Sequence, residues 1–209
     1  MGLGVSGKHG AFDTFSVGTG DLRGATPLWV AAYSANGGEG SRGGGGSAAI
    51  DIIRMLLDAG ADPDAATDDR TTPLMVAAGL GRASYQPGAK RGVRSQSAEA
   101  AVRILIDAGA DINAVNEADF TALHGAAFRG LNEVIEYLVE HGADIDALDF
   151  RGRTAYRIVQ GGQQGFRVQA WPETAALLQK LGADVTMGVD GLTDEREQAR
   201  RKPQTTNKR

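Results

Sequence analysis

The side chains best suited to acid or base chemistry in this sequence are its histidines. There are three, His9, His124 and His141, and histidine is the side chain whose charge changes near neutral pH. No serine or threonine lies in a recognised nucleophile motif with a histidine and a carboxylate. Nothing in the local sequence therefore predicts a nucleophile, and we expect the chain not to be an enzyme.

Closely spaced acids are the other chemical feature of the chain. The first group comprises Asp58, Asp62, Asp64, Asp68 and Asp69. A calcium-binding EF-hand loop needs Asp or Asn at alternate positions, then a glycine and a distal glutamate, and this spacing does not fit. Related groups follow at Asp111, Asn113 and Glu117, and at Asp144, Asp146 and Asp149. We interpret all of them as solvated turn residues and local caps, and we predict no metal site.

Two glycine-rich strings imitate nucleotide-binding motifs. Residues 2–9 approach the phosphate-loop pattern, but His9 stands where the magnesium-binding hydroxyl belongs, and no strand precedes it. Residues 38–43 spell the dinucleotide pattern Gly-x-Gly-x-x-Gly, yet they lie within a longer glycine tract. A tract of this composition is typical of a flexible linker. We therefore predict no nucleotide and no other cofactor.

Composition limits the classes of partner. The chain has 209 residues, 42% of them hydrophobic, and a net charge of -4, so it can form a packed core. A nucleic-acid-binding surface needs a concentrated basic face, which this balance does not favour. No run approaches the roughly 20 apolar residues of a membrane span, and residues 1–20 lack the apolar stretch of a signal peptide. These features favour a cytoplasmic protein that binds neither nucleic acid nor membranes.

The sequence repeats itself four times. Four segments close with nearly the same residues, ending in Gly-Ala-Asp, and they span 56–62, 105–111, 138–144 and 178–184. Four others open alike with a threonine followed mainly by apolar residues, at 26–32, 72–78, 121–127 and 154–160. Self-similarity of this kind determines a fold more strongly than any single local motif.

These paired motifs resemble those of the ankyrin repeat, whose first helix opens with a Thr-Pro-Leu-His-type signature. The glycine-rich insertions are similar to those of bacterial ankyrin-repeat proteins. The resemblance covers residues 21–187. It implies an all-α solenoid of helix pairs joined by hairpin-like loops, called fingers. It also implies that His124 ties the backbones of neighbouring fingers together.

The resemblance also divides the chain. We expect a flexible segment at 1–20, a disordered charged tail at 188–209, and repeats at 21–66, 67–115, 116–148 and 149–187. Each closing glycine precedes the next opening threonine by 12 residues, as Gly60 precedes Thr72. From opening threonine to closing glycine the distance varies, at 34, 37, 21 and 28 residues. The extra residues therefore lie between the two helices of a repeat, and we expect inserted loops near 35–47, 82–97 and 161–170.

Apolar residues in the second helices recur at i, i+3 and i+4, which marks one helical stripe per repeat. The stripes are Ile53, Leu56 and Leu57, then Val102, Leu105 and Ile106, then Ile135, Leu138 and Val139. A lone helix pair cannot cover such a stripe, whereas at least three stacked repeats bury a continuous core. We therefore expect Leu56, Leu105 and Leu138 to share one interior.

Glycines mark the ends of the helices and the tips of the fingers. Each closing glycine directly follows a helix, where a positive φ is needed at little steric cost. The ankyrin pattern also favours glycine two residues before the opening threonine. Gly24 and Gly152 conform, but Arg70 and Asp119 do not. Arginine tolerates a left-handed backbone less well than aspartate, so the sequence leaves the geometry of the second finger open.

The two ends of the array differ. The fourth repeat has Gln160 and Gln179 where the pattern has apolar residues, which is typical of a C-terminal cap with a polar outer face. The first repeat begins at once with the apolar run Leu28-Trp29-Val30 and has no such cap. We therefore expect the array to continue upstream in a longer protein.

The resemblance implies a function in binding another protein, and we expect a non-catalytic monomeric scaffold whose concave side is built from the fingers and the first helices. From the first helices we predict contacts by Val30, Tyr33, Val76, Leu80, Phe128 and Arg129. From the fingers we predict contacts by Asp68, Asp69, Glu117, Phe120, Phe150 and Arg151. Aromatic and arginine side chains are the expected anchors, because they dominate the binding energy of interfaces.

Two other functions stay open at this stage. The chain fits the regulatory C-terminal segment of a longer enzyme or multidomain protein, and it is also compatible, though less favoured, with a hydrolase that uses carboxylates of the fingers. The basic insertion at 82–97 is a candidate docking loop for an acidic surface, although such charges are more often simply solvated. No motif in the sequence identifies the partner.

Overall fold

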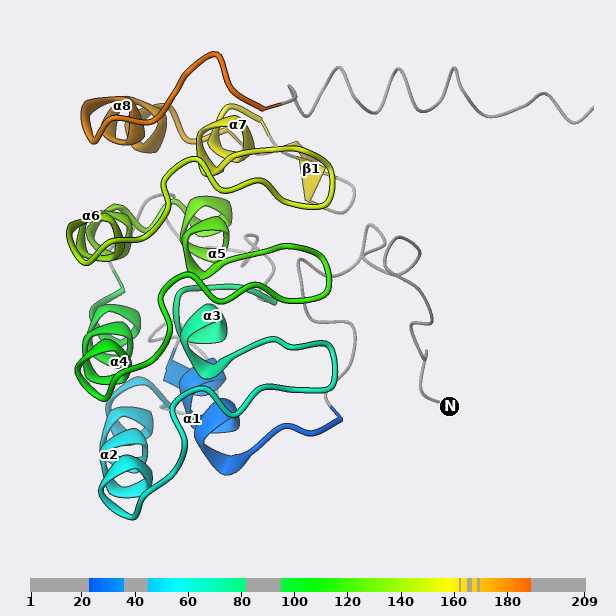
Figure 1. Ribbon diagram of the computed structural model, residues 1–209. Helices are drawn as coiled ribbons and strands as arrows, with labels where there is room; N and C mark the ends of the chain where they lie inside the picture. The colour runs from blue at the N-terminus through cyan, green and yellow to red at the C-terminus, as the bar shows by residue number, and fades with distance from the viewer. Residues whose placement is uncertain are drawn as a thin grey trace, which may run out of the picture.

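The computed structural model describes residues 23–35, 45–81, 95–161, 163–164, 167–168 and 170–188. Within these ranges the helices are α1 (Pro27–Ala35), α2 (Gly45–Asp58), α3 (Pro73–Ala77), α4 (Gln96–Asp107), α5 (Ala122–Arg129), α6 (Asn132–Glu140), α7 (Ala155–Val159) and α8 (Pro172–Lys180). They form successive pairs that stack in one row (Figure 1). The predicted all-α solenoid is confirmed.

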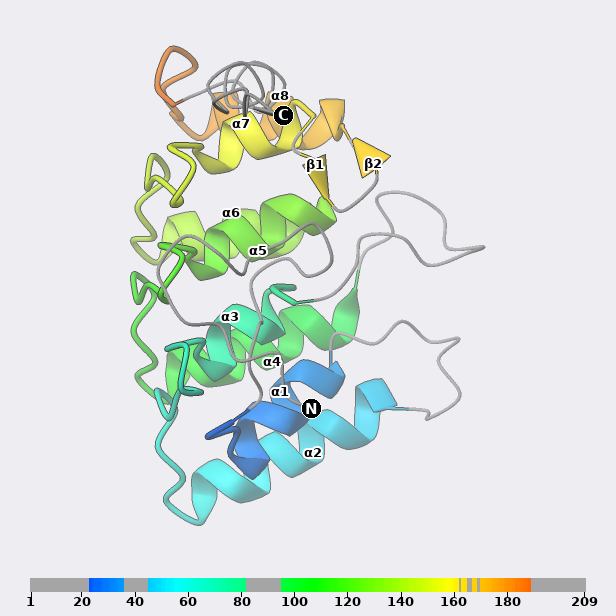
Figure 2. The ribbon, with the colours of Figure 1, turned by 90° about the vertical axis from the view of Figure 1, so that its right-hand side faces the viewer.

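The helices form two layers. The first helices α1, α3, α5 and α7 make one column and the second helices α2, α4, α6 and α8 make the other, while the fingers project to one side (Figure 1). Along each column every helix contacts the next, as α1 contacts α3 and α4 contacts α6. We call the fingers by their residues, 61–71, 110–120 and 143–153. The concave face is the face bounded by these fingers and the first helices (Figure 2).

A threonine cap begins each first helix. The hydroxyl of Thr26 accepts a hydrogen bond from the backbone N–H of Trp29 at 3.2 Å, and Thr72, Thr121 and Thr154 do the same three residues onward at 3.3–3.4 Å. Such a cap contributes about 1 kcal/mol, because it satisfies an N–H that has no partner within the helix. The conserved spacing of the motif within the chain thus sets where each first helix starts.

The four closing glycines end the second helices as predicted. Gly60, Gly109, Gly142 and Gly182 have φ of 87°, 92°, 93° and 103°. A Cβ added at any of them would meet nothing within 4 Å. The positive φ is therefore the reason for glycine at these positions, and steric crowding is not.

The fingers share one backbone geometry, including the finger that the sequence left open. Arg70 and Asp119 adopt φ of 64° and 56°, as Gly24 and Gly152 do at 79° and 74°. A left-handed arginine costs roughly 1–2 kcal/mol. Each finger compensates by bonding to its neighbour, since the backbone N–H of Asp68, Glu117 and Phe150 donates to the carbonyls of Arg23, Asp69 and Ala118 at 2.9, 3.0 and 3.1 Å.

The core runs through all the pairs as one cluster. Leu105 and Leu138 are 0% exposed, as predicted, whereas Leu56 is only half-buried. Ile53, at 0% exposed, is the buried anchor of α2. Leu56 differs from its counterparts because no described repeat precedes the first one, whereas Leu178 of the last repeat, which has a preceding neighbour, is 0% exposed.

Two predicted insertions need correction at their edges. Ala35 is the last residue of α1, and α2 begins at Gly45, inside the glycine tract that was expected to be loop from 35 to 47. The predicted loop at 161–170 contains two short paired strands, β1 (Gln163–Gln164) and β2 (Arg167–Val168), which the sequence did not predict. Residues 82–94 of the basic insertion, the segment 1–20 and the tail from 189 lie outside the described residues.

Candidate interaction surface

The residue three positions after the opening threonine joins one finger to the next. The Nδ1 atom of His124 accepts a hydrogen bond from the backbone N–H of Thr121 at 3.1 Å, so Nε2 carries the proton and donates to the carbonyl of Arg153 at 3.3 Å. In the first repeat Trp29 takes this role, because its indole Nε1 donates to the carbonyl of Thr71 at 3.0 Å. The predicted tying role of His124 is confirmed.

The second and fourth repeats depart from this arrangement. Met75 has no N–H to donate, and its sulfur instead accepts from the backbone N–H of Thr72 at 3.5 Å. Arg157 donates from Nε to the carbonyl of Met187 at 3.0 Å. In three of the four repeats, the side chain at this position therefore donates to a backbone carbonyl in the finger or turn that follows its repeat, and the three side chains differ.

Burial decides the charge state of His124. The side chain is 1% exposed, and desolvation lowers the pKa of His124 below its ordinary value of 6.5, against the opposing influence of Asp149. A neutral imidazole held on both nitrogens has no free atom for acid or base chemistry. The most chemically suggestive residue of the sequence is therefore a structural one.

An aromatic cluster fills the corner between α5 and the fingers of the third and fourth repeats. The ring of Phe120 lies 5.6 Å from Phe128 and 5.8 Å from both Phe150 and His124, in edge-to-face geometry. Phe120 and Phe128 are each 2% exposed, whereas Phe150 is half-buried. The guanidinium of Arg151, also half-buried, lies 5.2 Å above the ring of Phe150.

A buried ion pair holds the finger that carries Phe150 and Arg151. Asp149 Oδ2 accepts from Nη2 and Nε of Arg153 at 2.7 and 2.9 Å. Its Oδ1 accepts from the backbone N–H groups of Arg151 and Arg153, both at 2.9 Å. Both side chains are buried. All four hydrogen bonds to this carboxylate come from its own finger, and they fix the positions of the residues beside it.

Five of the predicted contact residues are buried and need correction. They are 6% exposed or less, and they are Asp69, Val76, Leu80, Phe120 and Phe128. In this structure these side chains support the surface from inside, and the residues that line it are others.

Each of the five has a local reason for its burial. The carboxylate of Asp69 accepts from the hydroxyl of Thr67 and the backbone N–H of Thr71 within its own finger. Val76 lies in α3, every residue of which is buried between α1 and α5. Leu80 packs on the next repeat, where a Cβ added to Gly125 would lie 3.2 Å from the Cβ of Leu80. Phe120 and Phe128 cover one another in the aromatic cluster.

The other seven predicted residues reach the surface. Asp68, Glu117 and Val30 are exposed, and Tyr33, Arg129, Phe150 and Arg151 are half-buried. Tyr33 stacks on Trp29 with ring centroids 5.4 Å apart, and its hydroxyl donates to the carbonyl of Gly81 at 3.3 Å. Val30 belongs to the outer face of the first repeat and not to the concave face.

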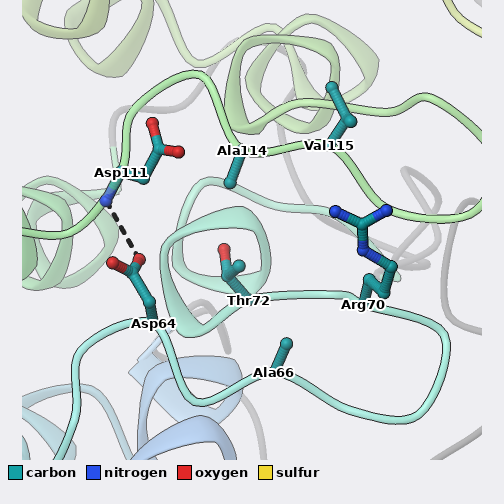
Figure 3. A pocket seen from close by; sticks show the side chains of 7 residues that line it. All are labelled: Asp64, Ala66, Arg70, Thr72, Asp111, Ala114 and Val115. Carbon is teal, nitrogen blue, oxygen red and sulfur yellow. Dashed lines mark hydrogen bonds between the residues drawn. The ribbon is translucent and has the colours of Figure 1, made fainter.

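Sequence reasoning missed two exposed apolar residues on the fingers. Val115 and Leu148 are 38% and 42% exposed. Both lie six residues before an opening threonine, and the finger 61–71 has Ala66 at the same position. That constant spacing was the available signal. Val115 lines a groove of about 270 Å³ between the fingers 61–71 and 110–120, together with Asp64, Ala66, Arg70, Thr72, Asp111 and Ala114 (Figure 3).

The finger acids form a ladder between repeats. The carboxylates of Asp64 and Asp146 accept from the backbone N–H groups of Asp111 and Asp184, both at 2.9 Å, and the Asn113 amide oxygen accepts from Asp144 N–H at 2.8 Å. Hydrogen bonds from Thr186 lower the pKa of the Asp184 carboxyl. Among the described residues, no group of three or more histidines and acids is arranged to hold a metal ion. Asp62, Asp111 and Asp144 also accept from backbone N–H groups two residues onward, as predicted for local turn caps. Asp69 and Asp149 are buried, so the prediction that all these acids are solvated was wrong.

Comparison with known proteins decides the family. The family model described as "Ankyrin repeat" matches residues 23–68 and 69–117, and a second, described as "Ankyrin repeats (many copies)", matches residues 105–159. Together these ranges span more than half of the chain. The chain belongs to the ankyrin-repeat family. Ankyrin repeats generally mediate contacts between proteins, and no helix in the described part of this ankyrin-repeat protein has both the length and the apolar character to cross a membrane.

One similar protein is a Caenorhabditis elegans homolog of transient receptor potential cation channel subfamily A member 1. The two sequences are 33% identical over 106 residues, which is 50% of this ankyrin-repeat chain and 7% of the channel protein. The chain thus spans a small part of the length of that relative.

Proposed function

We propose that this ankyrin-repeat protein is a non-catalytic scaffold that binds another protein on its concave face. The observation that carries the proposal is the corner beside α5, where Phe150 and Arg151 lie half-buried over a floor made by Phe120 and Phe128. Aromatic and arginine side chains on a rigid base are the residues that most often dominate the binding energy of an interface.

The rigidity of this corner supports the proposal. Binding costs conformational entropy, and that cost is smaller when the contact residues are already held in place. Here the Asp149–Arg153 ion pair fixes the backbone of the finger on both sides of Arg151. The edge-to-face contact with Phe120 fixes the ring of Phe150.

The charges on successive fingers suggest the character of the partner. The finger 61–71 exposes both Asp68 and Arg70, and Asp68 lies 3.8 Å from Arg23. The finger 110–120 exposes Glu117 and Asp119, whereas the finger 143–153 carries Arg151. A complementary partner would place a basic group opposite the finger 110–120 and an acidic group opposite Arg151, since complementary charges improve specificity and association rate.

Affinity capture from a lysate of the source organism tests the proposal. The bait is the tagged chain, and the matched variants are Phe150→Ala with Arg151→Ala, and Arg54→Ala with Asp58→Ala on the exposed side of α2, away from the fingers. We expect a partner that the first variant loses and the second retains. Once the partner is identified, titration should show a dissociation constant raised by about tenfold or more for the first variant. A partner held equally by both would contradict the proposal.

A second candidate function is that of a regulatory segment within a longer enzyme or multidomain protein. The observation that favours it is the match to only 7% of the channel homolog, in which a region similar to this chain is part of a much larger protein. Extending the reading frame upstream of Met1 in the genome, and detecting the longer product by mass spectrometry, would support this candidate. A transcript whose coding region starts at Met1 would exclude this candidate function.

A further inference from the structure

The first repeat exposes three large apolar side chains on its outer side. Val30 of α1 is 50% exposed, and Ile52 and Met55 of α2 are 48% and 70% exposed. We call these three residues the stacking face. They belong to the helices at one end of the row, where α1 and α2 lie (Figure 1).

The equivalent positions in the later repeats are covered. Val30 lies four residues after its opening threonine, and its counterparts Val76, Gly125 and Ile158 are buried. Ile52 lies eight residues before its closing glycine, and its counterparts Ala101, Val134 and Thr174 are buried. Met55 lies five residues before the same glycine, and its counterparts Ile104, Tyr137 and Leu177 are half-buried.

Contacts in the later repeats identify what covers these positions. At the Val30 position, a Cβ on Gly125 would meet the backbone of Leu80 at 2.7 Å. At the Met55 position, the guanidinium of Arg103 lies 4.1 Å above the ring of Tyr137. At the Ile52 position, the hydroxyl of Thr174 donates to Asn132 Oδ1 at 2.7 Å. In each case the covering residue belongs to the preceding repeat.

In α2 from Asp51 onward, the other exposed residues around the stacking face are charged. Asp51, Arg54 and Asp58 are exposed on the same helix, and their counterparts on α4, α6 and α8 are largely charged residues that reach solvent. The solvent-facing side of a helix normally carries charged and polar residues of this kind. Ile52 and Met55 instead continue the pattern of an interface between repeats.

The chain also enters α1 by the route that links repeats. Arg23 and Gly24 occupy the same finger positions as Asp69 and Arg70, with a φ of 79° at Gly24 and the Arg23 carbonyl accepting from Asp68 N–H. In the later repeats this finger connects a first helix to the second helix of the repeat before it.

We propose that the stacking face binds an ankyrin-type helix pair that lies upstream of residues 1–22 in a longer form of this polypeptide. A second copy stacked head to tail fits less well, because the opposite end of the row has Gln179 at the position where the earlier repeats have Leu57, Ile106 and Val139. Stacking that end on Ile52 and Met55 would bury the Gln179 amide against apolar side chains without a partner. The inference is independent of the concave-face function, since it concerns a different surface.

The test supplies the missing neighbour in the correct register. A copy of residues 121–153, which carries one helix pair and its finger, is inserted between Ala25 and Thr26 of the full chain. The inserted Gly142 then precedes Thr26 by the usual 12 residues. We expect one cooperative thermal transition with a Tm raised by about 5 °C or more, and amide exchange in α2 slowed by about tenfold.

Matched variants make the result specific. Ile52→Glu with Met55→Glu should abolish both gains in the extended chain but shift the Tm of the original chain by no more than about 2 °C, since both side chains are exposed there. An extended chain that is no more stable than the original would overturn the proposal. So would a large loss of Tm in the original chain, which would show that its own residues 1–22 cover the face. A concentration-dependent dimer that the same variant disrupts would also overturn it.

Discussion

The imidazole Nε2 of His124 donates to the carbonyl oxygen of Arg153 across the junction between the third and fourth repeats, at 3.3 Å. The indole of Trp29 makes the equivalent bond to Thr71 between the first and second repeats. One position of the repeat thus joins successive fingers at both of these junctions.

Stability should fall in mild acid because of His124. Burial lowers the pKa of this side chain below 6.5 in the folded state, so the unfolded chain binds the proton more readily. The contribution of the neutral ring is complete above about pH 6.5 and is lost as pH falls below that value. Urea unfolding at pH 7.5, 6.5 and 5.5 should show this loss. His124→Gln should flatten that part of the profile.

Met75→His should stabilise the array. The new ring can accept from the backbone N–H of Thr72 and donate to the carbonyl of Phe120, as His124 does with Thr121 and Arg153. A hydrogen bond of this kind contributes about 1 kcal/mol to the free energy of unfolding. Met75→Leu is the control, since it fills similar volume without an N–H. Equal stability of the two variants in urea unfolding would contradict the prediction.

Asp149→Asn should be strongly destabilising, and a second change should rescue it. The asparagine can still accept from the two backbone N–H groups, but it leaves the buried guanidinium of Arg153 without its carboxylate, at a cost of about 3–5 kcal/mol. Adding Arg153→Phe recreates the Asn116 and Phe120 combination of the third repeat, where Asn116 Oδ1 accepts from Ala118 and Phe120 N–H at 3.0 Å. Chemical denaturation of the two variants checks this, and a double variant as unstable as the single one would count against it.

Gly130→Ala should cost more than Gly142→Ala. Both glycines have positive φ, 64° and 93°, so either alanine incurs roughly 1–2 kcal/mol of backbone strain. At Gly130 the new Cβ would also lie 2.7 Å from the ring of Trp171, whereas at Gly142 it would meet nothing within 4 Å. Displacing the buried indole should add about 1–3 kcal/mol. Similar midpoints of unfolding for the two variants would show that Trp171 moves freely.

Sequence reasoning succeeded where the signal is local. The threonine caps and the closing glycines depend on the backbone geometry of a few neighbouring residues, and the structure places both as predicted. The apolar stripes of the second helices were also readable, because helices such as α4 have one covered side and one exposed side.

The first helices were harder to interpret for a physical reason. α3 is only Pro73–Ala77, and all its residues are buried, so its sequence has no polar side to mark orientation. The prediction therefore assigned Val76 and Leu80 to the concave face, although they pack between repeats. Arg70 was also undecidable from the sequence alone, because its left-handed backbone depends on the bonds between neighbouring fingers.

Periodicity and local backbone geometry were enough to predict the family, the helix pairs and the caps. The packing of one repeat on the next was needed to show which apolar residues form the core, which support the aromatic corner and which are left exposed on the first repeat. Those outcomes depend on whether a neighbouring repeat covers a given position. The amino acid at Val30 and at Val76 is the same, and only the presence of a preceding repeat separates an exposed side chain from a buried one.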